Sequence, residues 1–198
     1  MKNENQNKNS KEEFKKTVVR LHGETVDLAI FRKDREAVEI YTEWLNNEDY
    51  LHFLGRNQII QTFADEKKWA EREEKDNEFR FNIITKLDKQ MIGNCDIWAI
   101  PYNRSACLGI LIANKEFQNK GIGTEVIKLL LKYCFEELNM HNVMLQLDST
   151  NERAYKCYKK AGFKECGRER ECNFHHGKYS DTITMQILEQ DYFKYNEG

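Results

Sequence analysis

The chain has 198 residues, 40% of them hydrophobic, which suits one domain with a substantial core. Its 31 Lys and Arg against 33 Asp and Glu give a formal net charge of −2, which disfavours a dedicated DNA- or RNA-binding domain. No apolar run approaches the roughly 20 residues that span a bilayer. These features favour a globular protein of the cytoplasm.

Residues 1–16 are rich in Asn, Lys and Glu and lack the apolar core of a secretory signal, so a polar tail is expected there and a single domain over 17–198. None of the six cysteines forms a C-x-x-C pair, and most lie in apolar stretches. We therefore expect them to be small buried residues of a protein in a reducing compartment. They are Cys95, Cys107, Cys134, Cys157, Cys166 and Cys172.

The N-terminal part of the domain predicts two short strands followed by two helices. Strands over 17–21 and 25–31 flank a turn at His22-Gly23-Glu24. Asp34 then caps a helix whose apolar residues recur at helical spacing. A second helix, with charged residues on its solvated side, is expected over 63–74.

The middle of the chain predicts strands at 79–85 and 90–99, then a strand at 107–113. The last of these is nearly all apolar, as expected of a central strand buried on both faces. A helix over 124–138 and another buried strand over 143–147 follow.

The C-terminal part predicts a helix over 151–161, closed by Gly162, and two final strands at 163–172 and 179–188. A turn at 175–178 joins these strands. The cysteines and histidines of this hairpin lack the spacing of a zinc site, so no metal is expected and the histidines should be exposed. They are Cys166, Cys172, His175 and His176.

The loop at 118–124 lies between a predicted strand and a predicted helix. The first N–H groups of a helix lack internal acceptors and attract anions, and Gly121 and Gly123 would let a ligand approach the backbone. Lys120 adds a positive charge. The spacing fits neither a Walker A loop nor a dinucleotide fingerprint, which needs a third glycine where Val126 stands. Taken alone, the loop is equally consistent with a tight turn.

The helix over 151–161 places Asn151, Tyr155 and Tyr158 along one face. A polar amide and a phenol thus project from the same side, two turns apart. The alternative interpretation is that Tyr158 is a core aromatic residue whose hydroxyl finds a partner.

Two patterns, Q-x-x-G-x-G at 118–123 and N-x-x-A-x-x-x-Y-x-x-x-G-F at 151–163, resemble those of the GNAT acetyltransferase superfamily. The resemblance is specific over 107–163, weak before residue 79, and greatest to the branch of spermidine and ribosomal-protein alanine acetyltransferases. Gln118 stands where the family often has Arg, and Lys115 where Pro is common. The resemblance implies an α+β (mixed αβα) fold: a central, mostly antiparallel twisted sheet with a splayed pair of parallel strands, flanked by helices.

The resemblance also implies that acetyl-CoA binds between the splayed strands and that Tyr158 protonates the departing CoA thiolate. Asn151 would contact the pantetheine arm or position its helix. The residues expected to hold acetyl-CoA are Leu111, Ile112 and Ala113 for the pantetheine arm, and Gln118, Asn119, Lys120, Gly121, Ile122, Gly123 and Thr124 for the pyrophosphate.

Direct attack by an amine on the thioester is the mechanism expected. Tyr158 suits the acid step because a phenol has a pKa of about 10, close to that of a thiolate's conjugate acid. A backbone N–H near Ala113 would stabilise the oxyanion. A covalent intermediate on Cys157 is disfavoured because that residue points off the Tyr158 face. The general base stays open among Glu36, Glu48, Asp49 and Asp96.

The helices within 34–74 and the hairpin around 175–179 should wall the acceptor site. By resemblance, a polyamine or a protein N-terminal alanine is preferred as the acceptor. The alternatives are an amino sugar, a small amine antibiotic, or a non-catalytic acetyl-CoA sensor. No nucleic acid or membrane partner is expected, and pairing of apolar terminal strands would give a homodimer.

Overall fold

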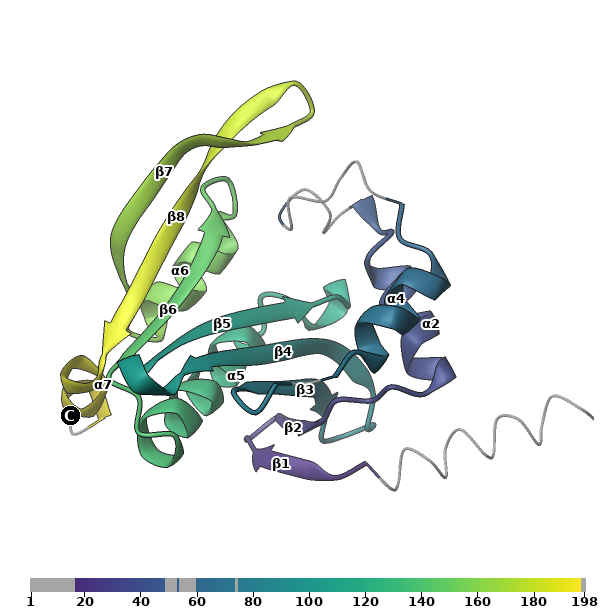
Figure 1. Ribbon diagram of the computed structural model, residues 1–198, viewed down its shortest axis with the longest axis horizontal. Helices are drawn as coiled ribbons and strands as arrows, with labels where there is room; N and C mark the ends of the chain where they lie inside the picture. Colours follow the sequence, from purple (N-terminus) through teal and green to yellow (C-terminus); the bar gives the residue numbers. More distant parts are fainter. Residues whose placement is uncertain (1–16, 49–52, 54–59, 74, 197–198) are drawn as a thin grey trace, which may run out of the picture.

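One sheet of eight strands, in the order β1-β2-β3-β4-β5-β6-β8-β7, forms the centre of the computed structural model (Figure 1). The structure describes residues 17–48, 53, 60–73 and 75–196, so the predicted tail at 1–16 lies outside the described residues. The strands are β1 (Val19–His22), β2 (Val26–Ile30), β3 (Glu78–Thr85), β4 (Met91–Ile100), β5 (Ser105–Ile112), β6 (Asn142–Asp148), β7 (Lys164–His175) and β8 (Lys178–Leu188). Neighbouring strands are antiparallel except for β5 and β6, which confirms the predicted mixed sheet.

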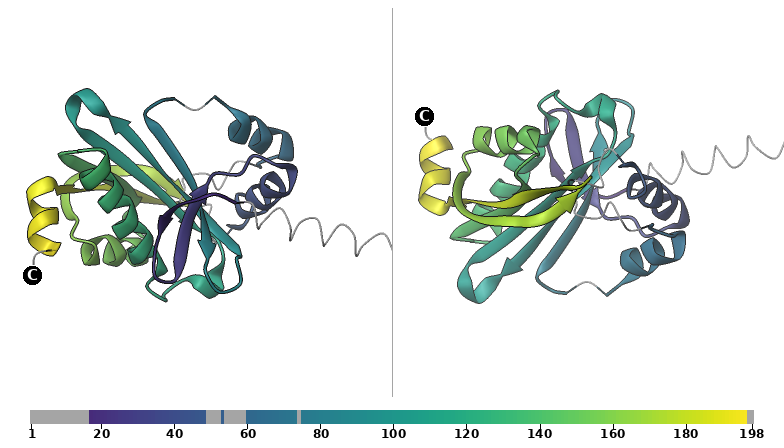
Figure 2. Two further views of the ribbon diagram at one scale, coloured as in Figure 1. Left: turned by 90° about the horizontal axis from the view of Figure 1, so that it is seen from below. Right: turned by 90° about the horizontal axis from the view of Figure 1, so that it is seen from above.

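The helices flank this sheet, as Figure 2 shows from two further directions. They are α2 (Arg35–Trp44), α4 (Phe63–Glu71), α5 (Ile122–Lys132), α6 (Glu152–Lys160) and α7 (Glu189–Asn196), with short turns η2 (Pro101–Asn103), η3 (Lys115–Phe117) and a π-helical turn η4 (Tyr133–Glu137). The predicted helix at 63–74 ends early, at Glu71, and α7 was not predicted. None of the helices in the described ranges is long and apolar enough to cross a membrane.

Local capping explains where several helices begin. Asp34 Oδ1 accepts a hydrogen bond from the Ala37 N–H (3.2 Å), which confirms the predicted start of α2. Thr62 and Asp65 form a reciprocal capping box at α4. These short-range bonds satisfy helix N–H groups that have no partner within their own helix.

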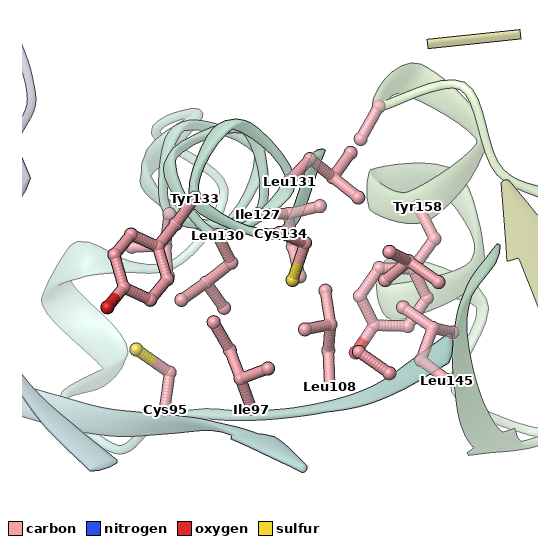
Figure 3. Packing of buried hydrophobic residues seen from close by; sticks show 14 of the residues in the cluster. Cys95, Ile97, Leu108, Ile127, Leu130, Leu131, Tyr133, Cys134, Leu145 and Tyr158 are labelled. Carbon is pink, nitrogen blue, oxygen red and sulfur yellow. The ribbon is translucent and has the colours of Figure 1, made fainter. Parts of the chain in front are cut away.

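Two apolar clusters lie on opposite faces of the sheet. Ile83 and Ile84 are consecutive on β3, yet each joins a different cluster, because successive strand side chains point to opposite faces. In the larger cluster, Ile127 and Leu130 of α5 pack over Ile97 of β4, and Tyr158 reaches the same layer from α6 (Figure 3). The smaller cluster holds α2 and α4 against β2, β3 and the start of β4.

Strand β5 departs from the prediction that it is buried on both faces. Cys107 is exposed, and Gly109, Ile110, Leu111 and Ile112 are only half-buried. Cys107 still pairs with Met144 of β6, but residues 109–112 lie beyond the three paired residues at the start of β5, where the two strands separate (Figure 1). A central strand therefore has an open edge in the middle of the sheet.

The cysteines are less buried than their apolar neighbours predicted. Cys95 and Cys134 are buried and Cys157 is half-buried, whereas Cys107, Cys166 and Cys172 are exposed. The last three are at exposed positions of β5 and β7. The prediction of mostly buried cysteines is therefore wrong for half of them.

The hairpin of β7 and β8 also differs from the predicted pair of apolar strands. β7 is at the sheet edge, and its mostly polar side chains are exposed. His175 is not exposed as expected, since its Nε2 lies 3.1 Å from Asp148 Oδ2, which also accepts a hydrogen bond from Ser180 Oγ (2.6 Å). This contact ties the far end of the hairpin to the end of β6.

Candidate active site

A cavity of about 690 Å³ opens where β5 and β6 separate. Its walls come from β5, from the loop into α5, from β6 and from α6. Among the lining residues are Leu108, Gly109, Ile110, Leu111, Ile112, Gln118, Asn119, Gly121, Gly123, Thr124, Asn151, Arg153, Lys156, Cys157, Tyr158 and Lys160. The structure thus brings most of the predicted site residues to one groove, although Ala113, Lys120 and Ile122 do not line it.

The loop into α5 has the backbone conformation that an anion site needs. Gly121 is the N-cap of α5 and has φ +84°, a region that favours glycine, while a Cβ there would meet nothing within 4 Å. The Glu125 N–H donates to the Gly121 carbonyl (3.0 Å), so the N–H groups before it are at the open end of the helix. Gly121 is therefore required by backbone geometry, and the helix end can bind negative charge.

Gly123 has a different role, in packing. A Cβ at this position would lie 3.3 Å from Cys157 Sγ and 3.5 Å from Ile112 Cδ1. Glycine thus lets the first turn of α5 lie close to both β5 and α6. Ile122 points the other way and is buried in the core, so only its backbone can contribute to the groove.

Gln118 connects two walls of the groove. Its Nε2 donates to the Ile112 carbonyl (2.9 Å), and its Oε1 accepts a hydrogen bond from Arg153 on α6. Arg153 was missed by the sequence prediction, as were Lys156 and Lys160. All three line the groove, and their spacing at i, i+3 and i+7 on one helix was the signal that could have found them.

The N–H of Ala113 itself does not face the groove, so an oxyanion donor near this residue would have to be an N–H of β5 instead. The Ala113 N–H donates to the Ile92 carbonyl of β4 (2.9 Å), and the side chain is buried. Backbone groups alternate in direction along a strand, so those of Ile110 and Ile112 point away from β4 and toward the groove. The Gln118 bond to the Ile112 carbonyl agrees with this direction. Residue spacing alone does not give the phase of the strand, so the sequence could not say which N–H near Ala113 points into the groove.

Asn151 and Tyr158 lie on α6 as predicted. Asn151 Oδ1 caps the helix by accepting from the Ala154 N–H (3.1 Å). Tyr158 is 8% exposed and lines the groove, and burial raises its pKa above that of a free phenol. Among the described residues none hydrogen-bonds to its hydroxyl. The phenol is thus protonated and open to a ligand on the groove side.

Cys157 faces the groove next to Thr124, with 3.4 Å between Sγ and Oγ1. Burial raises the pKa of this thiol. A neutral thiol is a weak nucleophile, because the thiolate is the reactive form. The structure therefore gives no support to a covalent intermediate on Cys157.

A second, smaller cavity of about 280 Å³ lies beside the groove. Its walls come from α2, α4, β4 and β5. The two helices that were predicted to wall the acceptor site therefore line this cavity, whereas no residue of the hairpin at 175–179 is among its lining residues. The lining residues are Tyr41, Trp44, Leu45, Glu66, Trp69, Asn94, Asp96, Gly109, Ile110 and Leu111. The last three also line the groove, so the two cavities meet across β5.

Aromatic and acidic residues together line this smaller cavity. Glu66 is 1% exposed, and Asp96 is half-buried. Burial raises the pKa of Asp96, although a hydrogen bond from the Trp98 indole N–H (3.1 Å) opposes the shift. Such a lining suits an organic cation, which rings and carboxylates both attract.

Asp96 is the one candidate base that lines this cavity in the described part of the chain. Glu36 forms an ion pair with Arg32 (2.8 Å), and Glu48 is exposed. Asp49 lies outside the described residues. Glu66 was missed as an acidic lining residue, because nothing in its charged helical neighbourhood marks it as buried.

The chain is similar to proteins with known names. A family model described as an acetyltransferase (GNAT) domain matches residues 24–164, well over half of the chain. The chain is 31% identical over 158 residues to a spermidine N(1)-acetyltransferase of Vibrio cholerae, covering 75% of this chain and 91% of the relative. A probable N-acetyltransferase of Bacillus subtilis is 28% identical over 167 residues, with 83% and 88% covered.

Solved structures agree with the sequence relatives. The crystal structure of spermidine N-acetyltransferase from Vibrio cholerae in complex with CoA and spermine has a TM-score of 0.75 at 26% identity, covering 85% of this chain and 98% of that one. A GNAT acetyltransferase from Bacillus anthracis, 19% identical with a TM-score of 0.71, has the same fold; 86% of this chain and 98% of that one are covered. The chain belongs to the GNAT family of acetyltransferases.

Proposed function

We propose that this enzyme transfers an acetyl group from acetyl-CoA to a primary amine of a polyamine such as spermidine. The observation that carries the proposal is the smaller cavity, which is lined by Trp44 and Trp69 together with Glu66 and Asp96, beside β5. A polyamine is a flexible chain with several positive charges, and it is attracted by rings and carboxylates together. The spermidine acetyltransferase relatives support this choice.

The groove fits acetyl-CoA in shape and charge. Its pyrophosphate would lie at the α5 N-terminus, where Gly121 gives the backbone its turn, and Arg153 and Lys156 supply positive charge nearby. The pantetheine arm would run along β5 and use the backbone groups of Ile110 and Ile112, which point into the groove. The thioester would then lie where the two cavities meet.

Tyr158 would act as the general acid on the departing CoA thiolate. Tyr158 lines the groove, and its raised pKa means that the phenol is protonated below the ordinary phenol pKa of about 10. As the nitrogen–carbon bond forms, the oxyanion would accept hydrogen bonds from the backbone of β5. Proton transfer to the sulfur would follow as the carbon–sulfur bond breaks.

The test is CoA release from acetyl-CoA with a panel of amines at equal concentration. The panel contains spermidine, spermine, putrescine, a peptide with N-terminal alanine, an amino sugar and an aminoglycoside. The proposal requires the highest kcat/KM for a polyamine with three or more amines, because a longer cation contacts both carboxylates of the smaller cavity.

Other rankings would replace the proposal with a defined alternative. A peptide that outperforms the polyamines would indicate a protein N-terminal acetyltransferase, and a preference for the sugar would indicate an amino-sugar enzyme. Saturable acetyl-CoA binding without turnover of any amine would indicate a sensor. Product analysis by mass spectrometry shows which nitrogen receives the acetyl group.

A further inference from the structure

We propose that Glu125 is a positioning residue for the acetyl-CoA site: its carboxylate joins the β1–β2 turn to the first turn of α5 and so keeps the loop at 118–124 in the conformation that receives the pyrophosphate. This inference rests on the proposed function, because it concerns the acetyl-CoA half of the same reaction. Glu125 does not line the groove. Its effect on the ligand therefore passes through the backbone of α5.

The carboxylate of Glu125 accepts four hydrogen bonds from the β1–β2 turn. Its Oε1 accepts from the N–H groups of Glu24 (2.6 Å), Thr25 (2.9 Å) and Val26 (3.3 Å), and its Oε2 accepts from the Thr25 hydroxyl. Successive backbone N–H groups that converge on one oxygen form a nest, a small concavity that binds anions. Thr25 is 100 residues earlier in the chain, so the contact joins two distant segments.

Gly23 lets the turn come this close to α5. A Cβ at this position would lie 2.3 Å from Glu125 Oε1, 2.5 Å from the Val26 carbonyl oxygen and 3.1 Å from Leu129 Cδ1. The first two distances are shorter than any Cβ contact of a relaxed structure, so a larger residue would displace the carboxylate or the turn. The β1–β2 turn and the start of α5 are therefore fitted to each other.

The charge on Glu125 strengthens this contact. Burial opposes the charged form, but the hydrogen bonds from Thr25, Val26 and Glu24 outweigh burial and lower the pKa of Glu125. The carboxylate is therefore ionised at neutral pH. Hydrogen bonds to an ionised acceptor are roughly twice as strong as those between neutral groups.

The position of Glu125 connects this contact to the loop. An acidic residue in the first turn of a helix commonly bonds the free N–H groups of its own helix end. Among the described residues, the donors to the Glu125 carboxylate belong instead to the β1–β2 turn, so the open end of α5 is left to a ligand. The Glu125 N–H donates to the carbonyl of Gly121, the residue with positive φ (3.0 Å). A shift of Glu125 would thus move the backbone of Gly121.

A second carboxylate joins the same hairpin to the other end of the helical stretch. Glu137, in the π-helical turn after α5, forms an ion pair with Arg20 of β1 (2.8 Å). The Arg20 guanidinium also lies 5.2 Å from the centre of the Tyr133 ring. Glu137 therefore matches Glu125 in charge and in the element it contacts, but it is remote from the loop at 118–124.

The experiment compares Glu125→Gln and Glu137→Gln with wild type by calorimetric titration with acetyl-CoA. Glutamine keeps the size of the side chain but loses the charge and replaces one acceptor oxygen with a donor. We expect the acetyl-CoA Kd of Glu125→Gln to rise by about 10-fold, within the usual range for coupling between a contact and a binding site. The Kd of Glu137→Gln should stay within about twofold of wild type, because its contact does not couple to the loop.

Steady-state kinetics with the amine that wild type acetylates fastest separate positioning from general destabilisation. Loss of ligand positioning should raise the KM of acetyl-CoA in Glu125→Gln, while the amine KM and kcat at saturation stay within about twofold. A residue that only stabilises the fold would lower the melting temperature without separating the two KM values.

Hydrogen exchange supplies a readout in the wild-type protein. Coupling between two sites is reciprocal, so acetyl-CoA should tighten the contact by the factor that the contact contributes to acetyl-CoA binding. Amide exchange at residues 24–26 should therefore slow by about 10-fold when acetyl-CoA saturates the wild-type enzyme. The same amides should show no such change in Glu125→Gln.

Thr25→Val keeps the Glu125 carboxylate and removes one donor, so it tests the contact even if Glu125→Gln does not fold. Valine has nearly the shape of threonine, and Thr25 is exposed. Loss of one hydrogen bond should raise the acetyl-CoA Kd by about threefold. Unchanged affinity in this variant would overturn the proposal.

Three other results would also overturn it. One is a Glu125→Gln enzyme that binds acetyl-CoA as tightly as wild type, or more tightly because the carboxylate repels the phosphates. Another is an equal loss of affinity in Glu125→Gln and Glu137→Gln. The last is exchange at residues 24–26 that acetyl-CoA does not alter. A wild-type protein that does not bind acetyl-CoA would refute the proposed function as well, whereas the other results refute this inference alone.

Discussion

The groove and the smaller cavity share Gly109, Ile110 and Leu111 of β5, but their other walls differ in kind. In the groove, the loop into α5 contributes backbone amides, a glycine at φ +84° and one helix end, all from a single stretch of chain. The smaller cavity is lined by the side chains of Tyr41, Glu66 and Asp96, which are far apart in sequence. The anion site proposed for the loop therefore depends on local backbone geometry, whereas the lining of the smaller cavity depends on long-range packing.

Tyr158→Phe should give the largest loss of kcat, because Tyr158 is proposed to act in the acetyl transfer itself, where the ligands of both cavities meet. Without the hydroxyl the thiolate leaves unprotonated, so we expect kcat to fall by about 100-fold or more. The ring still fills its place in the core, so acetyl-CoA affinity and thermal stability should change little. Stopped-flow turnover with calorimetric binding of acetyl-CoA checks this.

The wild-type pH profile gives the same prediction a second test. Burial raises the pKa of Tyr158, so the phenol keeps its proton throughout the range below the ordinary phenol pKa of about 10. Activity should therefore show no loss from Tyr158 ionisation in that range. Unchanged turnover in Tyr158→Phe would remove the acid role.

Gly121→Val should affect the groove alone. A β-branched residue at positive φ costs roughly 1–3 kcal/mol of backbone strain, and relaxation of the loop would misplace the amides at the α5 N-terminus. We expect acetyl-CoA affinity to fall by about 30-fold, in keeping with that cost. Isothermal titration measures the change.

Gly177→Val is the matched control for this strain. Gly177 also has positive φ (+78°) with nothing within 4 Å of a Cβ, but it lies in the β7–β8 turn. The control should lose similar stability and keep its acetyl-CoA affinity. Equal affinity in the two variants would contradict the phosphate assignment.

Trp44→Ala should affect the smaller cavity alone. Trp44 is half-buried at the end of α2, and its ring lies 5.7 Å from that of Tyr41. Loss of one cation–π contact, about 1 kcal/mol, should raise the KM of the polyamine by about fivefold and leave acetyl-CoA binding intact. Tyr102→Ala, at an exposed position after β4, is the control and should leave the polyamine KM unchanged. A change in acetyl-CoA affinity with Trp44→Ala would contradict the assignment of the polyamine and acetyl-CoA to separate cavities.

Arg153→Ala should give the smallest effect, a decrease in acetyl-CoA affinity of about threefold, because a charge near solvent contributes little. The loss should shrink as ionic strength rises, since salt screens the phosphates. Arg168→Ala on β7, which removes an equal charge outside the groove, should leave affinity unchanged. A salt-independent loss would mean that Arg153 acts through its Gln118 contact instead.

The sequence predicted the groove better than the smaller cavity. Gly121 and Tyr158 were found from spacing, because helix ends and helix faces repeat over a few residues. The N–H near Ala113 that faces the groove could not be chosen from sequence, since the direction of each strand N–H depends on pairing with β4. Arg153 was missed, although its helical spacing with Lys156 was visible. The single domain over 17–198 stays a prediction.

The sequence by itself determined the order of strands and helices, the caps of α2 and α6, and the family resemblance carried by 107–163, because these features depend on neighbouring residues. Only the tertiary structure decided that Asp96, among the described candidate carboxylates, lines the smaller cavity. Asp96 lies there through its pairing with Arg80 and Gly109, and Glu66 through the packing of α4. Such contacts join segments distant in the chain, and no local pattern of residue types specifies them.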